Sequence, residues 1–178
     1  MSAHYETIIA VDPGASGAMA LFVRGRADVV VDMPTVQERI SGMWRTRPDV
    51  RGLSGIMGAM IERADTLPLL VLERVHATKR DGPSRAFAFG RYYESIRQCA
   101  ACYRMDERTV PPNKWKQDLR LTNDKTQSLG RAREVFPSFE LRLSRKKDDG
   151  RAEALLIGHW YLCFGEDYFD EDEVQAVS

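Results

Sequence analysis

The segment IIAVDPGASGAMAL, residues 8–21, carries the clearest structural signals in the chain. An apolar run over residues 7–11 predicts a buried strand that ends at Asp12, because a proline–glycine pair follows at once and favours a tight turn. Strand-like patterns resume over residues 17–23 and 27–33, and a glycine flanked by arginines between them predicts a hairpin turn. The chain therefore opens with three strands in a meander.

Beyond this meander, helical and strand-like spacings alternate. Helices are predicted over residues 50–64, 84–100, 114–119, 124–135 and 148–164, strands over 69–72 and 103–110, and irregular connections over 34–48 and 136–147. That order predicts an α/β fold, with a mixed sheet and helices on its faces. Because repeats and domain linkers are absent from the sequence, residues 1–165 are expected to form one domain and residues 166–178 an acidic tail.

The composition is that of an ordinary soluble globular domain. The 178 residues are 43% hydrophobic and 29% charged. No apolar run approaches the roughly 20 residues that span a bilayer, and the first residues lack the features of a secretory signal, so a cytoplasmic protein is expected. Cys99, Cys102 and Cys163 are interpreted as reduced packing residues, because no second pair of metal ligands accompanies them.

The formal net charge of zero conceals an uneven distribution of charge. Residues 166–178 hold six acids and no lysine or arginine, so the rest of the chain carries 26 basic against 20 acidic residues. Residues 79–120 alone hold ten basic and five acidic residues. Such a basic segment is usually a solvated face, and it is also compatible with a surface that binds phosphates.

Four acidic side chains occupy positions from which they can converge. Asp12 and Glu73 end predicted strands, and Asp149 and Glu153 are four residues apart on one face of the last helix. Taken singly, the first two are ordinary turn or cap residues. In the helix pair, Asp149 would be favoured by the dipole at the helix N-terminus and Glu153 would lie in solvent. Taken together, they predict a cluster that holds two divalent cations, because Mg²⁺ prefers carboxylate, water and phosphate oxygens.

A two-cation carboxylate site has a defined chemistry. Two ions about 3.5–4 Å apart activate the attacking water and stabilise the leaving oxygen in phosphodiester cleavage, so that the protein needs no nucleophile of its own. In agreement, the sequence contains no Walker A loop, no GxSxG elbow and no HExxH helix.

Five blocks, in order along the chain, carry a family resemblance: IIAVDPGASGAMAL (8–21), VLERVHA (71–77), FAFGRYYESI (87–96), VPPNKWKQDLRLTNDKTQS (110–128) and KKDDGRAEALLIG (146–158). They resemble successive blocks of the RuvC-type Holliday-junction resolvases, especially the short phage-like members. The resemblance omits only residues 24–68 and the tail. It implies an RNase H-like fold with a mixed five-stranded sheet, and a bacterial or phage-encoded endonuclease that cuts four-way DNA junctions with two Mg²⁺ ions, for which Mn²⁺ substitutes.

The resemblance also assigns the catalytic, metal-binding acids. Asp12, Glu73 and Glu153 match three of the family's four acids directly. The fourth, which many members carry three residues before the last, falls on Gly150. Asp149 is the natural substitute and Asp148 the alternative, because a helix brings residues three or four apart onto one face.

Family lysines match Lys116 and Lys125, which either stabilise charge at the scissile phosphate or anchor the DNA backbone without a catalytic role. His76 stands where some members carry an aromatic wedge. Because histidine is a poorer wedge, the preferred interpretation is a surface loop residue. The expected DNA-binding residues are His76, Lys79, Arg80, Arg85, Arg91, Lys114, Lys116, Lys125, Lys146 and Lys147.

A stripe of large apolar side chains follows the basic loop, at Phe87, Phe89, Tyr92, Tyr93 and Ile96. Such a stripe is typical of a core face. The resemblance implies in addition that this helix forms a two-fold dimer, and a homodimer would supply the two symmetric nicks that a four-way junction requires.

Three alternatives to a junction resolvase stay open at this point. The same acids would serve a nuclease that acts on flaps, forks or RNA–DNA hybrids. A protein that binds junctions without cutting them would share the basic surface. A sugar kinase or actin-like ATPase also has an aspartate–glycine loop after its first strand, but it needs a second domain of the same fold.

Overall fold

A mixed five-stranded sheet forms the centre of the protein, which a computed structural model describes over residues 5–74 and 82–169. The strand order is β3-β2-β1-β6-β7. β2 pairs antiparallel with β1 and β3, whereas β6 pairs parallel with β1 and β7. The predicted α/β fold with a mixed sheet is therefore confirmed. The strands are β1 (Ile8–Asp12), β2 (Ala18–Val23), β3 (Arg26–Asp32), β6 (Leu69–Glu73) and β7 (Glu107–Val110).

The two central strands are apolar because both faces of the sheet are covered. All residues from Ile8 to Val11 in β1, and from Leu69 to Leu72 in β6, are fully buried. Strands buried on both faces have near-continuous hydrophobic sequences rather than an alternating pattern. Each of the two strands ends in an acid, Asp12 and Glu73, at the edge of the buried region.

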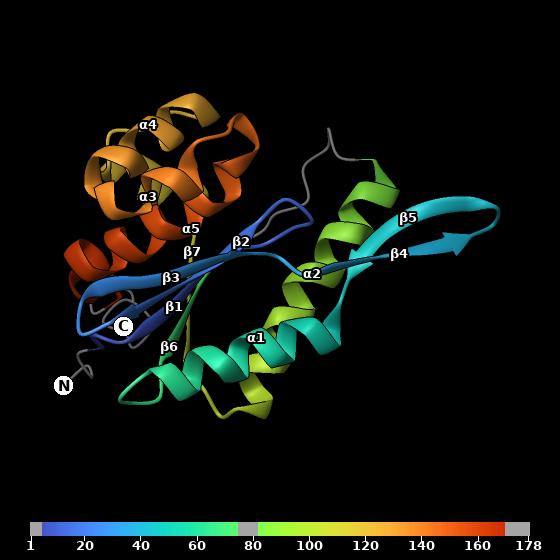
Figure 1. The fold of residues 1–178 in the computed structure, drawn as a ribbon, viewed down its shortest axis with the longest axis horizontal. Coiled ribbons are helices and arrows are strands. Elements are labelled where there is room, and N and C mark those ends of the chain that lie inside the picture. Colours follow the sequence, from blue (N-terminus) through green and yellow to red (C-terminus); the bar gives the residue numbers. More distant parts are fainter. Residues whose placement is uncertain (1–4, 75–81, 170–178) are drawn as a thin grey trace, which may run out of the picture.

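Helices cover both faces of the sheet in two separate layers (Figure 1). On one face, α1 (Val50–Arg63) and α2 (Pro83–Cys102) pack over Ile9, Val11 and their neighbours. On the other face, α5 (Asp149–Trp160) packs against β1 and β2. α3 (Pro112–Asp118) and α4 (Lys125–Val135) pack in turn against α5.

Local sequence signals explain where the helices begin and end. Asp49 and Asp124 cap α1 and α4 by accepting hydrogen bonds from backbone N–H groups of the first turn. β7 begins four residues later than predicted, because α2 runs to Cys102 and the chain then turns through Arg104 at a φ of 58°. Residues 136–147, predicted to be irregular, form mainly short 3₁₀ turns, Pro137–Leu143 and the first part of Lys146–Asp148.

Residues 34–48, also predicted to be an irregular connection, form a hairpin instead. β4 (Thr35–Ile40) pairs antiparallel with β5 (Met43–Pro48), and Ser41 and Gly42 make the turn with φ values of 50° and 82°. Figure 1 shows this hairpin extending away from the sheet. The prediction was wrong because both hairpin faces are largely exposed, so the sequence lacks the alternation of apolar and polar residues that marks a half-buried strand.

The packed structure continues beyond residue 165, through a π-helical turn (Tyr161–Gly165) and the residues that follow it. The rings of Tyr168 and Phe169 make edge contacts with Trp160 of α5. Residues 170–178 lie outside the described residues. Among the helices in the described part of the chain, none is long and apolar enough to cross a membrane.

Candidate active site

Asp12 and Glu73 come together because their strands are parallel neighbours. β1 and β6 pair in register up to Val11 and Leu72, so the next residue of each strand lies at the same edge of the sheet. In open α/β sheets this carboxyl edge is the usual position for a binding site. The turn after Asp12 is tight, because a Cβ added at Gly17 would lie 2.0 Å from the Asp12 carbonyl oxygen.

The first turns of α5 bring a second pair of acids to the same edge. Asp149 and Glu153 are both buried, with 9% and 7% of their surfaces exposed. Burial raises the pKa of Asp12 well above its usual value, and the nearby charges of Glu73 and Glu153 raise it further. Asp12, Glu73 and Glu153 therefore interact electrostatically at this edge of the sheet.

Glu73 is a buried acid of this cluster whose carboxyl group is oriented by a hydrogen bond from a tryptophan. Burial is the main cause that raises its pKa, to about 7, and the charge of Glu153 adds to the effect. The indole Nε1–H of Trp115 donates a 2.8 Å hydrogen bond to Glu73 Oε1, which opposes the shift and fixes the orientation of the carboxyl group. Trp115 is fully buried, and no sequence motif marked it except its place beside Lys116.

The two predicted lysines lie against the acids of α5. Lys116 Nζ is 3.0 Å from Glu153 Oε1, and Lys125 pairs with Asp149. The Ser128 hydroxyl also donates to Glu153 Oε1, at 3.4 Å. α3 and α4 thus supply two cations to a site that collects four acids.

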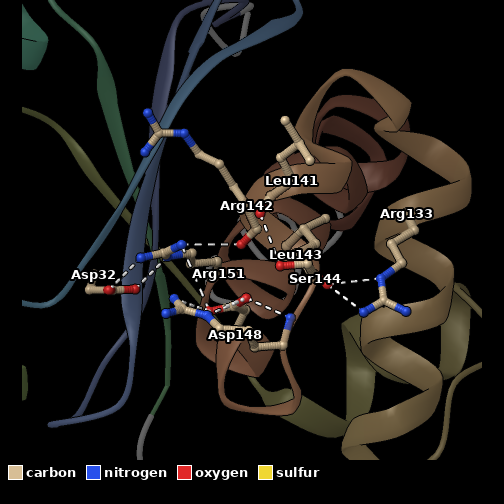
Figure 2. A network of polar contacts seen from close by, with 9 residues as sticks. Asp32, Arg133, Leu141, Arg142, Leu143, Ser144, Asp148 and Arg151 are labelled. Atoms are coloured by element: carbon tan, nitrogen blue, oxygen red, sulfur yellow. Dashed lines mark hydrogen bonds and ion pairs between the residues drawn. The ribbon is translucent and has the colours of Figure 1, made fainter.

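Asp148 and Asp149 face different surroundings, which separates the two candidates for the fourth acid. Asp148 accepts hydrogen bonds from the Arg145 backbone N–H and guanidinium, at 2.9 and 2.7 Å, and Arg151 Nη1 lies 3.8 Å away. These contacts, chiefly those of Arg145, lower the pKa of Asp148. Figure 2 shows Arg151 between Asp148 and Asp32, on the side of α5 that faces the end of β3.

Gly150 has a packing role that explains why no acid stands there. A Cβ added at this position would lie 2.1 Å from the Ser16 carbonyl oxygen and 3.0 Å from the Gly17 Cα. A side chain at residue 150 is therefore incompatible with the close approach of α5 to the turn after Asp12. Of the two candidates for the fourth acid, Asp149 pairs with Lys125, which also acts on Glu153 and Asp12, whereas Asp148 pairs with Arg145.

The chemistry of these donors suits a hard divalent cation. Among the described residues, no three acid, histidine or cysteine side chains are already gathered as a metal-binding group. The acids instead pair with lysines or, at Asp12 and Glu73, hold protons more tightly than usual. Buried carboxylates that repel one another are stabilised when a positive charge lies between them. A Mg²⁺ ion coordinated by carboxylate and water oxygens can provide that charge.

The predicted DNA-binding residues fall into three groups. His76, Lys79 and Arg80 lie outside the described residues. In the second group, Lys116 and Lys125 contact the acids, the exposed pair Lys146 and Lys147 directly precedes Asp148, and Lys114 instead pairs with Asp118 at 3.1 Å and lies over the ring of Tyr168. The third group, Arg85 and Arg91, lies on α2 and lines a cleft beside the hairpin.

The aromatic stripe on α2 divides between core and surface. Tyr92 and Ile96 are buried in the core, whereas Phe87 and Phe89 are 71% and 36% exposed. The three cysteines are free thiols, of which Cys99 alone is buried. Their interpretation as reduced residues agrees with this, but Cys102 and Cys163 are exposed rather than packed.

The structure of RuvC from Thermus thermophilus superposes on this chain with a TM-score of 0.50, over 90% of this chain and 95% of RuvC, at 14% sequence identity. The chain has the RuvC fold. A second structure, T. thermophilus RuvC in complex with a Holliday junction substrate, has a TM-score of 0.49 at 14% identity and covers 92% of this chain and 96% of its own. No family model matches the sequence.

One curated relative is also similar in sequence. The protein named Holliday junction resolvase MOC1, chloroplastic, from Chlamydomonas reinhardtii is 45% identical over 56 residues, which are 30% of this chain. The match spans only 6% of the length of that relative. The RuvC fold confirms the predicted RNase H-like architecture.

Proposed function

We propose that this protein is a divalent-metal-dependent endonuclease that resolves four-way DNA junctions. The observation that carries the proposal is that Asp12, Glu73 and Glu153, from two neighbouring strand ends and one helix, interact electrostatically. Asp149 pairs with Lys125, whose charge also acts on Asp12 and Glu153. The RuvC fold and the matched segment of a Holliday junction resolvase support it.

In this proposal Asp12, Glu73, Asp149 and Glu153 hold two Mg²⁺ ions, and Mn²⁺ replaces them. Bound ions would supply Lewis acidity that lowers the pKa of water and stabilises the leaving oxygen. Trp115 keeps the Glu73 carboxyl oriented through its 2.8 Å hydrogen bond. The orientation matters because a ligand held by a second contact is positioned before the cation arrives.

The same proposal assigns Lys116 and Lys125 to the scissile phosphate. Each ammonium group now neutralises an acid of α5. With cations on those acids, both ammonium groups would be free to contact a phosphate oxygen close by, where fixed positive charge stabilises developing negative charge. Lys146 and Lys147, exposed beside the same helix start, extend the positive surface along the DNA backbone.

The proposal includes a homodimer, because two symmetric nicks require two active sites related by a two-fold axis. Sedimentation analysis is expected to give twice the chain mass of 20.2 kDa. A monomer on the junction as well as in solution would contradict this part. The cytoplasmic location, in a bacterial or phage-infected cell, is also proposed; the Chlamydomonas relative is chloroplastic.

Substrate choice is tested by comparing initial cleavage rates on a four-way junction, a three-way junction, a flap and an RNA–DNA hybrid, at equal Mg²⁺ and salt. We expect the four-way junction to be cut fastest, with paired nicks in opposite strands. A faster reaction on the flap or hybrid would replace the junction as substrate. Tight junction binding without nicking in Mg²⁺ or Mn²⁺ would instead identify a binding protein.

A further inference from the structure

We infer that the cleft between the β4–β5 hairpin and α2 binds a single DNA strand. The cleft has a volume of about 530 Å³. The inference rests on the proposed function, because it supplies a second contact for the same branched DNA. The lining residues are Ile40, Arg45, Thr46, Arg47, Ser84, Arg85, Phe87, Ala88 and Arg91.

The charge of the cleft favours a phosphate-bearing ligand. Arg45 and Arg47 reach it from the hairpin, and Arg85 and Arg91 from α2. Among the described residues that line the cleft, none is acidic; Glu38, the cross-strand neighbour of Arg45, pairs with Arg47 from beside it. Four guanidinium groups with one carboxylate leave a surplus of positive charge, and guanidinium is the side-chain group best matched to phosphate oxygens.

The same face of α2 offers a surface for a base. Ser84, Phe87, Ala88 and Arg91 follow the spacing that places residues on one side of a helix, and all four line the cleft. Phe87 is the most exposed aromatic side chain of that face, at 71%. An aromatic ring between arginines is the pattern by which proteins hold unpaired nucleotides, with bases stacked and phosphates paired.

The size of the cleft selects a single strand over a duplex. A volume of about 530 Å³ lies in the range of pockets that enclose small organic ligands, so it admits one or two nucleotides but not a double helix. A second copy of this chain is a poorer occupant of the cleft itself, because a two-fold contact centred on the cleft would bring the same arginine cluster against itself. The dimer expected for α2 would have to use a part of the helix outside the cleft.

The position of α2 connects this cleft with the candidate active site. Phe89, two residues after Phe87, lies against the turn that follows Asp12: a Cβ added at Gly14 would be 3.0 Å from Phe89 Cε2. The first turns of α2 therefore lie between the cleft and the acids. An unpaired DNA strand that leaves the centre of the four-way junction at the acids would therefore pass along α2 into the cleft.

Binding of fluorescein-labelled oligothymidylate, measured by anisotropy in EDTA over a range of salt concentrations, tests the inference. We expect Arg45→Ala, Arg85→Ala and Arg91→Ala each to weaken binding and to reduce the salt slope by about 0.7 for each phosphate that is no longer neutralised. We expect Phe87→Ala to weaken binding about tenfold without changing the slope. The matched control is Arg26→Ala, which removes an exposed arginine at the opposite end of β2 and β3.

The outcomes separate this inference from the nuclease proposal. Salt slopes of all three arginine variants equal to that of the unmodified protein would overturn the strand-binding cleft, even if the protein nicks junctions. Tighter binding of a linear duplex than of oligothymidylate, with the same dependence on these arginines, would also overturn it. A change in sedimenting mass in place of a change in slope would assign the cleft to contacts between copies. Cleft-dependent binding by a protein that never nicks junctions would overturn only the nuclease proposal.

Discussion

At the level of single residues, the acids at the sheet edge differ in how their negative charge is reduced, either by a bound proton or by a neighbouring lysine. Asp12 and Glu73 have raised pKa values because burial and neighbouring acids disfavour their ionised forms. Asp149 and Glu153 pair with lysines. The site is therefore held together partly by protons and lysines, which a divalent cation would displace.

Glu73 makes the stability of the metal-free protein depend on pH. Its pKa is about 7 in the folded chain against 4.5 for a free side chain, so the folded state binds the proton more tightly. Its contribution to stability is complete below pH 4.5 and is lost as the pH rises to 7. Glu73→Gln keeps the hydrogen-bond acceptor for Trp115 but does not titrate. Between pH 4.5 and pH 8 in EDTA, we expect the unfolding free energy of the unmodified protein to fall by about 2–3 kcal/mol more than that of Glu73→Gln.

Urea denaturation at the two pH values measures this difference in unfolding free energy. Glu62→Gln is the matched control, because Glu62 is an exposed glutamate on α1. Equal pH dependence in the unmodified protein and Glu73→Gln would show that Glu73 does not hold its proton more tightly in the folded state.

At the scale of elements, the contact between α5 and the turn after β1 positions the site. Gly150 permits it, because any side chain there would collide with the Ser16 carbonyl group. We expect Gly150→Ala to lower the unfolding free energy by about 1–3 kcal/mol, the usual cost of overpacking. Gly130, in the interior of α4, has open space at its Cβ position, so Gly130→Ala is expected to gain about 0.5–1 kcal/mol.

Denaturant titration of the two glycine variants makes this comparison directly. Both variants add the same methyl group to a helix, so the sign of the change separates packing from helix propensity. Destabilisation of similar size in both would contradict the role given to Gly150.

The elements also show which features sequence can predict. β1 and β6 were predictable because strands buried on both faces have continuous apolar sequences, and their terminal acids mark the edge. The β4–β5 hairpin was not, because it is exposed on both faces and has no apolar periodicity. The acid pairings of Lys116 and Lys125, and the hydrogen bond from Trp115, depend on how α3, α4 and α5 pack together. Spacing along the chain does not contain that information.

At the scale of the whole molecule, the proposed cation site joins the sheet to the helical layer formed by α5. A cation bound only in the folded state stabilises it, by about 2.7 kcal/mol when the free concentration is 100 times the dissociation constant. At pH 8 we expect Mg²⁺ to raise the melting temperature of the unmodified protein by several degrees. Asp12→Asn should abolish most of that rise. An equal rise in both proteins would place the cation elsewhere.

Nicking of a synthetic immobile four-way junction shows whether the clustered acids cut DNA through bound cations. The unmodified protein is expected to nick the junction in Mg²⁺ and to stop in EDTA. Asp12→Asn is expected to bind the junction with unchanged affinity and to leave it uncut. Nicking by Asp12→Asn at the rate of the unmodified protein, under matched metal and salt, would show that the clustered acids do not carry out the cleavage.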